Sequence, residues 1–533
     1  MRSTSFFTHA LRLLPFLAPA VLARNPAGLP EKIYGVNLGS WLVLESWMLP
    51  QGWLDMGGQS CSDCSTCIAT EGAFAEAYPD TVDEIFAKHW ETWFNQTDAD
   101  ALAENGINTV RIPLGYWIVE ALVNRTNGEY FPKGGLAQLR RGLQELNKVG
   151  IVAILDHHAL PGAQDAEQQF TGRCTATPEF YTPYNYQRAL TWTAVMATLA
   201  HIDPAFANAV ALEAVNEPIM DASQTPGLGD FELNFVRVVR GVEFLLGLGL
   251  PVSVSASLKA SVVPAPNNGN YTAMLHGIAD VEEIFTPEVR EALIAAVPIL
   301  LEMGYLGLPQ PGARREPLIT TFMDVNWQYG ANVSNPAAAA IGPQVYDNHL
   351  YYVFGGVADA NPDAYMESIC NLNRIQADAA LGDSPLFFGE WGLPTQFNAT
   401  DEFLVMWADA QKLMYGQGAG WLFWNFKVEI SELAANLSRE WSYLEGVKLG
   451  YLTKDPAELH NPDVCVPYLA GASSSSSSVA STSTTSSTAV TSSAPATTTS
   501  VETTVTSASV ATTHASASAS ASAPATTSRR VPK

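Results

Sequence analysis

Two glutamates, each near the end of a short apolar run, could act together chemically in this sequence. Glu217 follows the run in AVALEAVNEP, residues 209–218, and Glu390 stands between Gly389 and Trp391 in PLFFGEWG. Short apolar runs bounded by proline or glycine are typical of buried strands in a parallel sheet. Two carboxyl groups held close together can serve as nucleophile and as proton donor. We therefore expect Glu217 and Glu390 to share one site at the strand ends.

Other polar side chains sit at similar places. Arg111 lies in NTVRIPLGYW, and His157 and His158 end the run IVAILDHH. Adjacent histidines on a strand point to opposite faces and cannot bind one metal together, so we expect neither a metal nor a cofactor. Glu213 competes with Glu217 in the same run, but it lies deeper, and we interpret it as a buried pairing carboxylate.

The elements needed to position these residues alternate between strand and helix. Short apolar runs predict strands at 34–38, 108–117, 151–158, 209–218, 251–257, 344–354, 385–392 and 420–427. Helical periodicity or composition predicts helices at 81–106, 133–150, 185–201, 231–248, 287–303, 364–381 and 401–415. About eight alternations over this length predict an α/β fold, a (β/α)8 TIM barrel with loop insertions. The carboxyl ends of its strands form the active-site face, where Glu217 and Glu390 fall.

Composition indicates a secreted protein. Residues 1–23 begin with Arg2, continue with an apolar stretch and end in small residues, as a signal peptide does, whereas a membrane anchor would not be interrupted by charges and prolines. Six cysteines suit an oxidising compartment and could all pair. The cluster CSDCSTC lacks the second ligand pair of a zinc finger. Glycosylation sequons occur at Asn95, Asn124, Asn270, Asn332, Asn398 and Asn436.

The charge and the end of the chain limit the partners. A formal net charge of -25 disfavours nucleic acid and anionic membranes. Residues 24–470 are expected to form the catalytic domain. Residues 471–533 are nearly all Ser, Thr, Ala and Val, which predicts a disordered, O-glycosylated tail that could hold the protein at a cell wall. No later segment is long and apolar enough to span a membrane, and we expect a monomer.

The ordered motifs NTVRIPLGYW, LDHHALPGAQ, EAVNEP, NHLYY, GEWG and GWLFW resemble glycoside hydrolase family five, in particular its fungal β-glucanases. The resemblance covers about residues 34–469. It implies that Glu217 is the acid/base and Glu390 the nucleophile of a retaining reaction on β-glucan. Further residues that it implies bind or orient the sugar or the catalytic pair are Glu45, Trp47, Arg111, His158, Asn216, His349, Tyr351 and Trp424.

Two departures from the exo-β-1,3-glucanases lie beside the expected site. Ser46 stands where those enzymes have proline, and residues 52–67 form a cysteine-rich insertion. Loop segments such as GEYFPKGGL resemble the endo-β-1,6-glucanases more closely, which favours internal cleavage of β-1,6-glucan. The aromatic candidates for sugar platforms are Trp47, Trp53, Tyr181 and Tyr184. An exo-β-1,3-glucanase, a β-glucan transglycosylase and a non-catalytic glucan-binding wall glycoprotein remain alternatives.

Overall fold

The computed structural model describes residues 25–248, 285–305, 316–324, 327 and 341–469. The expected signal peptide and tail, and the sequons Asn270 and Asn332, lie outside these residues. Within them, every helix is too short or too polar to cross a bilayer.

The described chain forms a closed parallel barrel in which each strand pairs with the next and β8 returns to β1. The expected (β/α)8 TIM barrel is confirmed. The strands are β1 Ile33–Asn37, β2 Thr109–Gly115, β3 Val152–Ala159, β4 Ala209–Glu213, β5 Ile319–Met323, β6 Gln344–His349, β7 Leu386–Glu390 and β8 Gly420–Phe423. Nearly every strand residue is buried, since helices cover the barrel outside and side chains fill it inside.

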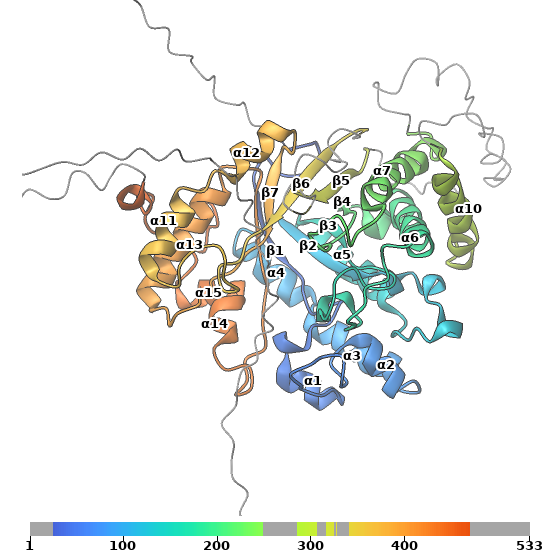
Figure 1. Ribbon diagram of the computed structural model, residues 1–533, viewed down its shortest axis with the longest axis horizontal. Coiled ribbons are helices and arrows are strands. Elements are labelled where there is room, and N and C mark those ends of the chain that lie inside the picture. The colour runs from blue at the N-terminus through green and yellow to red at the C-terminus, as the bar shows by residue number, and fades with distance from the viewer. Residues whose placement is uncertain (1–24, 249–284, 306–315, 325–326, 328–340, 470–533) are drawn as a thin grey trace, which may run out of the picture.

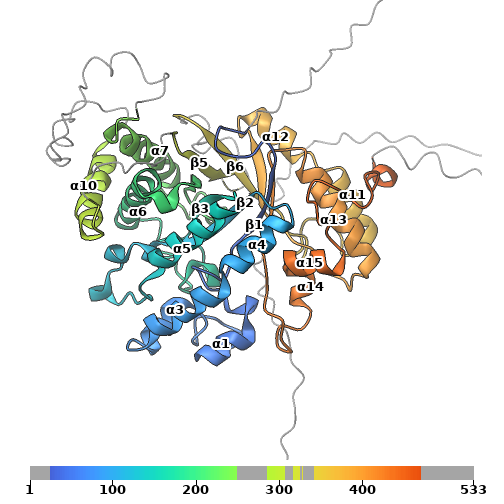
Figure 2. The same cartoon turned by 180° about the vertical axis from the view of Figure 1, so that it is seen from behind.

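The helices surround this barrel (Figures 1 and 2). They are α1 Pro50–Met56, α2 Glu71–Ala77, α3 Val82–Trp93, α4 Gln96–Glu104, α5 Gly135–Lys148, α6 Pro183–Ile202, α7 Leu228–Leu245, α10 Pro287–Glu302, α11 Pro362–Cys370, α12 Arg374–Leu381, α13 Asp401–Tyr415, α14 Leu437–Trp441 and α15 Tyr443–Leu449. Figure 1 shows α6, α7 and α10 together on one flank and α11 with α13 on the opposite flank. Because all the strand pairs are parallel, the carboxyl ends of β1 to β8 lie together at one end of the barrel.

Three sequence predictions are wrong in detail. The helix expected at 81–106 is two helices, because Asn95 caps α4 through a reciprocal capping box with Asp98. The helix expected at 364–381 is also divided, into α11 and α12. The fifth barrel position belongs to Ile319–Met323, where no strand is predicted; the strand expected at 251–257 lies outside the described residues.

All six cysteines pair, as expected. The disulfides are Cys61–Cys67, Cys64–Cys174 and Cys370–Cys465. The second one joins the insertion after β1 to the loop after β3. Ser46 makes a parallel link, because its hydroxyl donates to Gln169 Oε1 at 3.2 Å. Ser46 and the cysteine-rich insertion therefore both connect the loop after β1 to the loop after β3, beside the active-site face.

Candidate active site

Glu217 and Glu390 meet at the carboxyl end of the barrel. Glu390 is the last residue of β7, and Glu217 follows the end of β4 with φ +40°. Such a backbone conformation is rare for a residue with a side chain and is found mainly where the surrounding structure enforces it. One carboxylate oxygen of each glutamate lies within 4.8 Å of the other and of a His349 nitrogen. The two carboxyl groups are thus close enough to act on one bond.

Arg111 connects Glu390 to Glu213 and Asn216. It is fully buried on β2, and Nη1 donates to Glu390 Oε1 at 2.9 Å. Nε donates to Glu213 Oε2 at 2.8 Å, and Nη2 donates to Asn216 Oδ1 at 2.6 Å. Glu213 is therefore the buried pairing carboxylate that the sequence predicts. The fixed guanidinium holds residues from β2, β4 and β7 in one arrangement.

His349 contacts both glutamates, and Tyr351 contacts Glu390. His349 Nδ1 lies 2.7 Å from Glu217 Oε1 and 3.6 Å from Glu390 Oε2. The Tyr351 hydroxyl donates to Glu390 Oε2 at 3.0 Å. Both residues are predicted to lie on one strand, but β6 ends at His349, and Tyr351 belongs to the loop that follows.

The ionisation of this cluster is set by burial and by its neighbours. Burial opposes protonation of His349, but the charges of Glu390 and Asp347 and the hydrogen bond to Glu217 outweigh it and raise its pKa well above the usual range. Burial raises the pKa of Glu390 to about 7, against the lowering effects of His349 and Arg111. Burial also opposes ionisation of Glu217, but its contact with His349 holds its pKa below the usual value. The positive charge of His349 therefore favours the ionised form of both glutamates.

His158 and Trp424 stack on each other at the same end of the barrel. His158 Nδ1 lies 2.6 Å from Asp156 Oδ2, and the imidazole stacks on the Trp424 ring with centroids 5.7 Å apart. Burial lowers the pKa of His158 to about 3, so this ring is neutral. Phe170, in the loop held by Cys174, packs edge-on against it. Trp424 is 4 % exposed, so most of its surface packs inside the protein.

Glu45 and Trp47 lie in the loop after β1. Trp47 Nε1 donates to Glu45 Oε2 at 2.9 Å, and Glu45 is buried. Burial raises the pKa of Glu45 to about 8, with a further contribution from Glu390 and Glu217. The charges of Glu390 and Glu217 therefore act on the carboxyl group of Glu45. All ten predicted site residues come together at this end of the barrel.

The aromatic platform candidates separate into two groups. Trp53 is 1 % exposed, and its indole donates to backbone oxygens of its own loop, so it packs the loop. Tyr181 is likewise buried, with its hydroxyl bonded to Gln164 O. Trp47 is half-buried and packs edge-on against Trp441 at 5.2 Å. Tyr184 is exposed and receives a hydrogen bond from Asn124.

Sequence reasoning missed two members of an aromatic wall beside Glu390. We use this name for Trp47, Tyr351, Phe354 and Trp441. Tyr351 packs on Trp441 at 5.5 Å and on Phe354 at 5.7 Å, and the Phe354 side chain is 54 % exposed. Phe354 follows the predicted NHLYY motif closely enough to have been suspected, whereas no local signal in the sequence points to Trp441.

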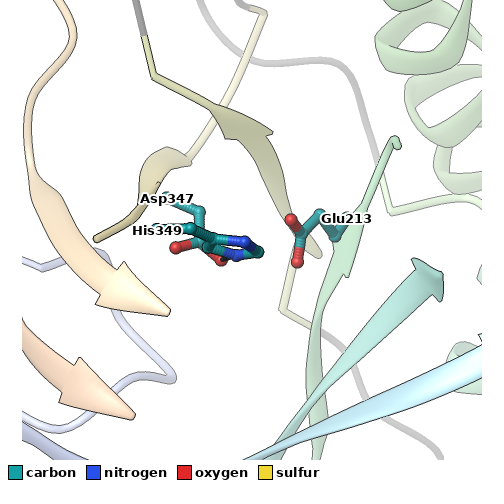
Figure 3. A group of neighbouring side chains, drawn as sticks. All are labelled: Glu213, Asp347 and His349. Atoms are coloured by element: carbon teal, nitrogen blue, oxygen red, sulfur yellow. Dashed lines mark ion pairs between the residues drawn. The ribbon is translucent and has the colours of Figure 1, made fainter. Parts of the chain in front are cut away.

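A second cluster of acidic groups and histidine lies deeper (Figure 3). Glu213 on β4 faces Asp347 and His349 on β6, with ligand atoms within 4.8 Å of one another. Such a spacing could suit a metal ion. Here, however, Arg111 Nε lies 2.8 Å from Glu213 Oε2 and 3.5 Å from Asp347 Oδ2. The guanidinium already supplies the positive charge between these carboxylates, and we assign no metal to them.

A (β/α)8 barrel with two close carboxyl groups at the carboxyl ends of its strands is an architecture of glycoside hydrolases. Residues 78–244 match the family model described as cellulase (glycosyl hydrolase family 5), and the chain is a glycoside hydrolase. The expectation of an enzyme, against a non-catalytic wall glycoprotein, is confirmed.

Two relatives and one solved structure illustrate the similarity. Glucan endo-1,6-beta-glucosidase B of Emericella nidulans is 28% identical over 447 residues, covering 82% of this chain and 88% of the relative. Probable glucan 1,3-beta-glucosidase A of Aspergillus fumigatus is 31% identical over 216 residues, covering 40% of this chain and 47% of the relative. The crystal structure of rutinosidase from Aspergillus niger aligns with a TM-score of 0.50 at 19% identity, covering 79% of this chain and 97% of that one, and shows the shared fold alone.

Proposed function

We propose that this protein is a secreted, retaining β-glucan hydrolase that cleaves internal β-1,6 bonds. The observation that carries the mechanism is the separation of Glu217 and Glu390, with oxygens within 4.8 Å. Retaining glycosidases hold their two carboxyl groups about 5 to 5.5 Å apart, whereas inverting ones need about 6.5 to 9.5 Å to admit a water molecule. The short separation supports a covalent intermediate.

In the first step, Glu390 Oε attacks the anomeric carbon as the glycosidic C–O bond breaks. Glu217 gives its proton to the departing oxygen. In the second step, Glu217 takes a proton from water, whose oxygen attacks the same carbon and releases Glu390. Two inversions leave the product in the β configuration.

The surrounding residues suit these roles. Arg111 and Tyr351 each bind one oxygen of Glu390, which fixes the carboxylate for attack and stabilises its ionised form. His349 is a charged neighbour from which Glu217 can receive its proton at 2.7 Å. Asn216 Nδ2 has no hydrogen-bond partner among the described residues and is available for the 2-hydroxyl of the sugar. A contact of that kind strengthens as the oxocarbenium-like state forms.

Binding of the sugar would use aromatic surfaces. Trp424 would form the floor beneath the glucose ring undergoing reaction, beside His158. The aromatic wall would stack further rings of a polysaccharide, as apolar sugar faces pack against aromatic side chains. The three disulfides support an extracellular location. The tail, residues 471–533, could retain the enzyme at the cell wall.

The β-1,6 preference is supported by the relative from Emericella nidulans, whose similarity covers most of both chains. The shorter match to a glucan 1,3-beta-glucosidase keeps exo-cleavage of β-1,3-glucan as a second candidate. Transfer of the intermediate to a sugar instead of water would use the same residues.

Product analysis tests these proposals together. The purified enzyme is incubated with linear β-1,6- and β-1,3-linked gluco-oligosaccharides, with Glu390→Gln as the inactive control. We expect internal cleavage of the β-1,6 series and an initial β-anomer by proton NMR. Release of glucose from the β-1,3 series alone would overturn the linkage. An initial α-anomer would overturn the retaining mechanism, and longer products than the substrate would indicate transglycosylation.

A further inference from the structure

The pairing of β6 and β7 is irregular immediately before Glu390. Asn348 pairs with Phe388, but the next residue, His349, pairs with Glu390. Gly389 is thus an extra residue in β7, a β-bulge. Bulges leave one residue outside the ladder and turn the following side chain to a new direction. Here the side chain that follows is that of Glu390.

Both backbone groups of Gly389 are bound by buried side chains from other strands. Gly389 N–H donates to Asp347 Oδ1 at 2.6 Å, and Asn37 Nδ2 donates to Gly389 O at 2.7 Å. Asp347 and Asn37 are fully buried, on β6 and β1 respectively. The polar groups that the bulge would otherwise leave unpaired inside the protein are thereby satisfied.

Gly389 has to be glycine for this arrangement. A methyl group on its Cα would collide with the Asp347 carboxylate. The Asp347 carboxylate can approach the backbone this closely only because Gly389 has no side chain.

Asp347 and Asn37 also contact the groups that hold the catalytic pair. Arg111 Nη1 donates to Asn37 Oδ1 at 3.2 Å as well as to Glu390. Asp347 Oδ2 lies 3.5 Å from Arg111 Nε and 3.5 Å from His349 Nε2. The other nitrogen of His349 contacts Glu217. Asp347 and Asn37 thus bind the backbone before Glu390. Between them they also contact Arg111 and His349, the side chains that hold the two glutamates.

We infer that Asp347 and Asn37 are positioning residues that clamp the bulge at Gly389 and so aim Glu390 at the anomeric carbon. Neither residue belongs to the pair that exchanges bonds or protons with substrate. The inference rests on the proposed role of Glu390 as nucleophile. A displacement of about 1 Å at a reacting group can cost on the order of 100-fold in rate, so loss of the clamp should act on kcat.

The test uses the full-length enzyme and whichever glucan the wild type cleaves. We expect Asp347→Ala and Asn37→Ala each to lower kcat by about 30- to 100-fold while KM changes by less than about threefold. Asp347→Asn keeps an oxygen that can accept from Gly389 N–H, so it should recover at least about 10-fold of the loss. Thr321→Val, another fully buried polar side chain of the barrel, is the matched control and should stay within about twofold of wild type.

A double-mutant cycle distinguishes one clamp from separate structural effects. Gly389→Ala should lower kcat about as much as Asp347→Ala, and the combined variant should lose no more than the worse single variant. Losses that multiply, or normal kcat in both Asp347→Ala and Asn37→Ala, would overturn the inference. If Asp347→Ala fails to fold, Asn37→Ala and Asp347→Asn decide it, with Tm as the check. An active Glu390→Gln would instead overturn the proposed function itself.

Discussion

His349 Nδ1 lies 2.7 Å from Glu217 Oε1, so the proposed acid/base contacts a histidine that its neighbours keep charged. The same nitrogen is 3.6 Å from Glu390 Oε2. The imidazolium therefore lies between the two carboxylates, reduces their repulsion and lets them stay close. Groups coupled this strongly titrate as a unit, and a proton can be redistributed among them as the sugar gains and loses charge.

The first prediction separates the roles of the two glutamates. Glu390→Gln should lower turnover of glucan by at least about 1,000-fold, because no carboxylate remains to form the intermediate. Glu217→Ala should be similarly slow on glucan but recover partly on an aryl glycoside with a good leaving group, which needs no proton. Steady-state kinetics on both substrates measure this. Turnover of glucan by Glu390→Gln near the wild-type rate would reject the assignment.

The second prediction concerns the exposed end of the aromatic wall. Phe354→Ala removes a ring that is 54 % exposed next to Tyr351, so it should raise KM for polysaccharide by about 3- to 10-fold with little change in kcat on a short substrate. Met406→Ala is the control, since Met406 is an exposed apolar residue on α13, outside the barrel. Equal KM values for the two variants on long and short substrates would exclude a role for Phe354 in stacking.

The sequence predicts much of this site because strand ends carry their signal locally. Glu217, Glu390, Arg111 and His349 each follow or lie within a short apolar run, and the barrel topology brings such runs together. The bulge at Gly389 depends on how two strands pair, and the place of Trp441 depends on a long loop folding back. Neither leaves a periodic pattern in the sequence.

The fold shows the same limit. The strand at 319–323 includes Thr320 and Thr321 and lies in a stretch, 304–343, to which the sequence predictions assign no element, so the sequence misplaces the fifth strand. By contrast, the break between α3 and α4 could have been found. Asn95 followed three residues later by Asp98 is a capping signal, and the continuous helical periodicity obscures it.

The third prediction concerns the Ser/Thr-rich tail. A chain ended after Ala470 keeps every described element, including the Cys370–Cys465 disulfide. It should show a Tm within about 2 °C of the full chain and the same activity on soluble glucan. Its retention on insoluble glucan should fall if the tail holds the enzyme at the cell wall. A large drop in Tm would mean that residues beyond 470 contribute to the folded domain.

The last prediction follows from His157, which the catalytic mechanism does not use. Its ring stacks on Trp192 at 3.9 Å between the barrel and α6, and neither ring nitrogen has a hydrogen-bond partner among the described residues. Burial lowers the pKa of His157 well below its ordinary value of 6.5. The folded protein therefore keeps this ring neutral, whereas the unfolded chain takes up a proton below about pH 6.5. Folding stability from this group is complete above that pH and is lost as the pH falls below it.

His157→Phe keeps an aromatic ring against Trp192 and removes the group that titrates. When the pH is lowered from about 7.5 to about 5, the Tm of this variant should fall less, or rise more, than that of the wild type, by roughly 2 °C or more. The other buried groups contribute equally in both proteins: burial lowers the pKa of His89 to about 4 and that of His158 to about 3, and it raises the pKa of Glu45 to about 8. His460→Phe, at a partly exposed histidine paired with Asp409, serves as the control and should not reduce the pH dependence in this way. Thermal unfolding followed by circular dichroism across this pH range gives the comparison, and parallel curves for wild type and His157→Phe would show that protonation of His157 does not limit acid stability.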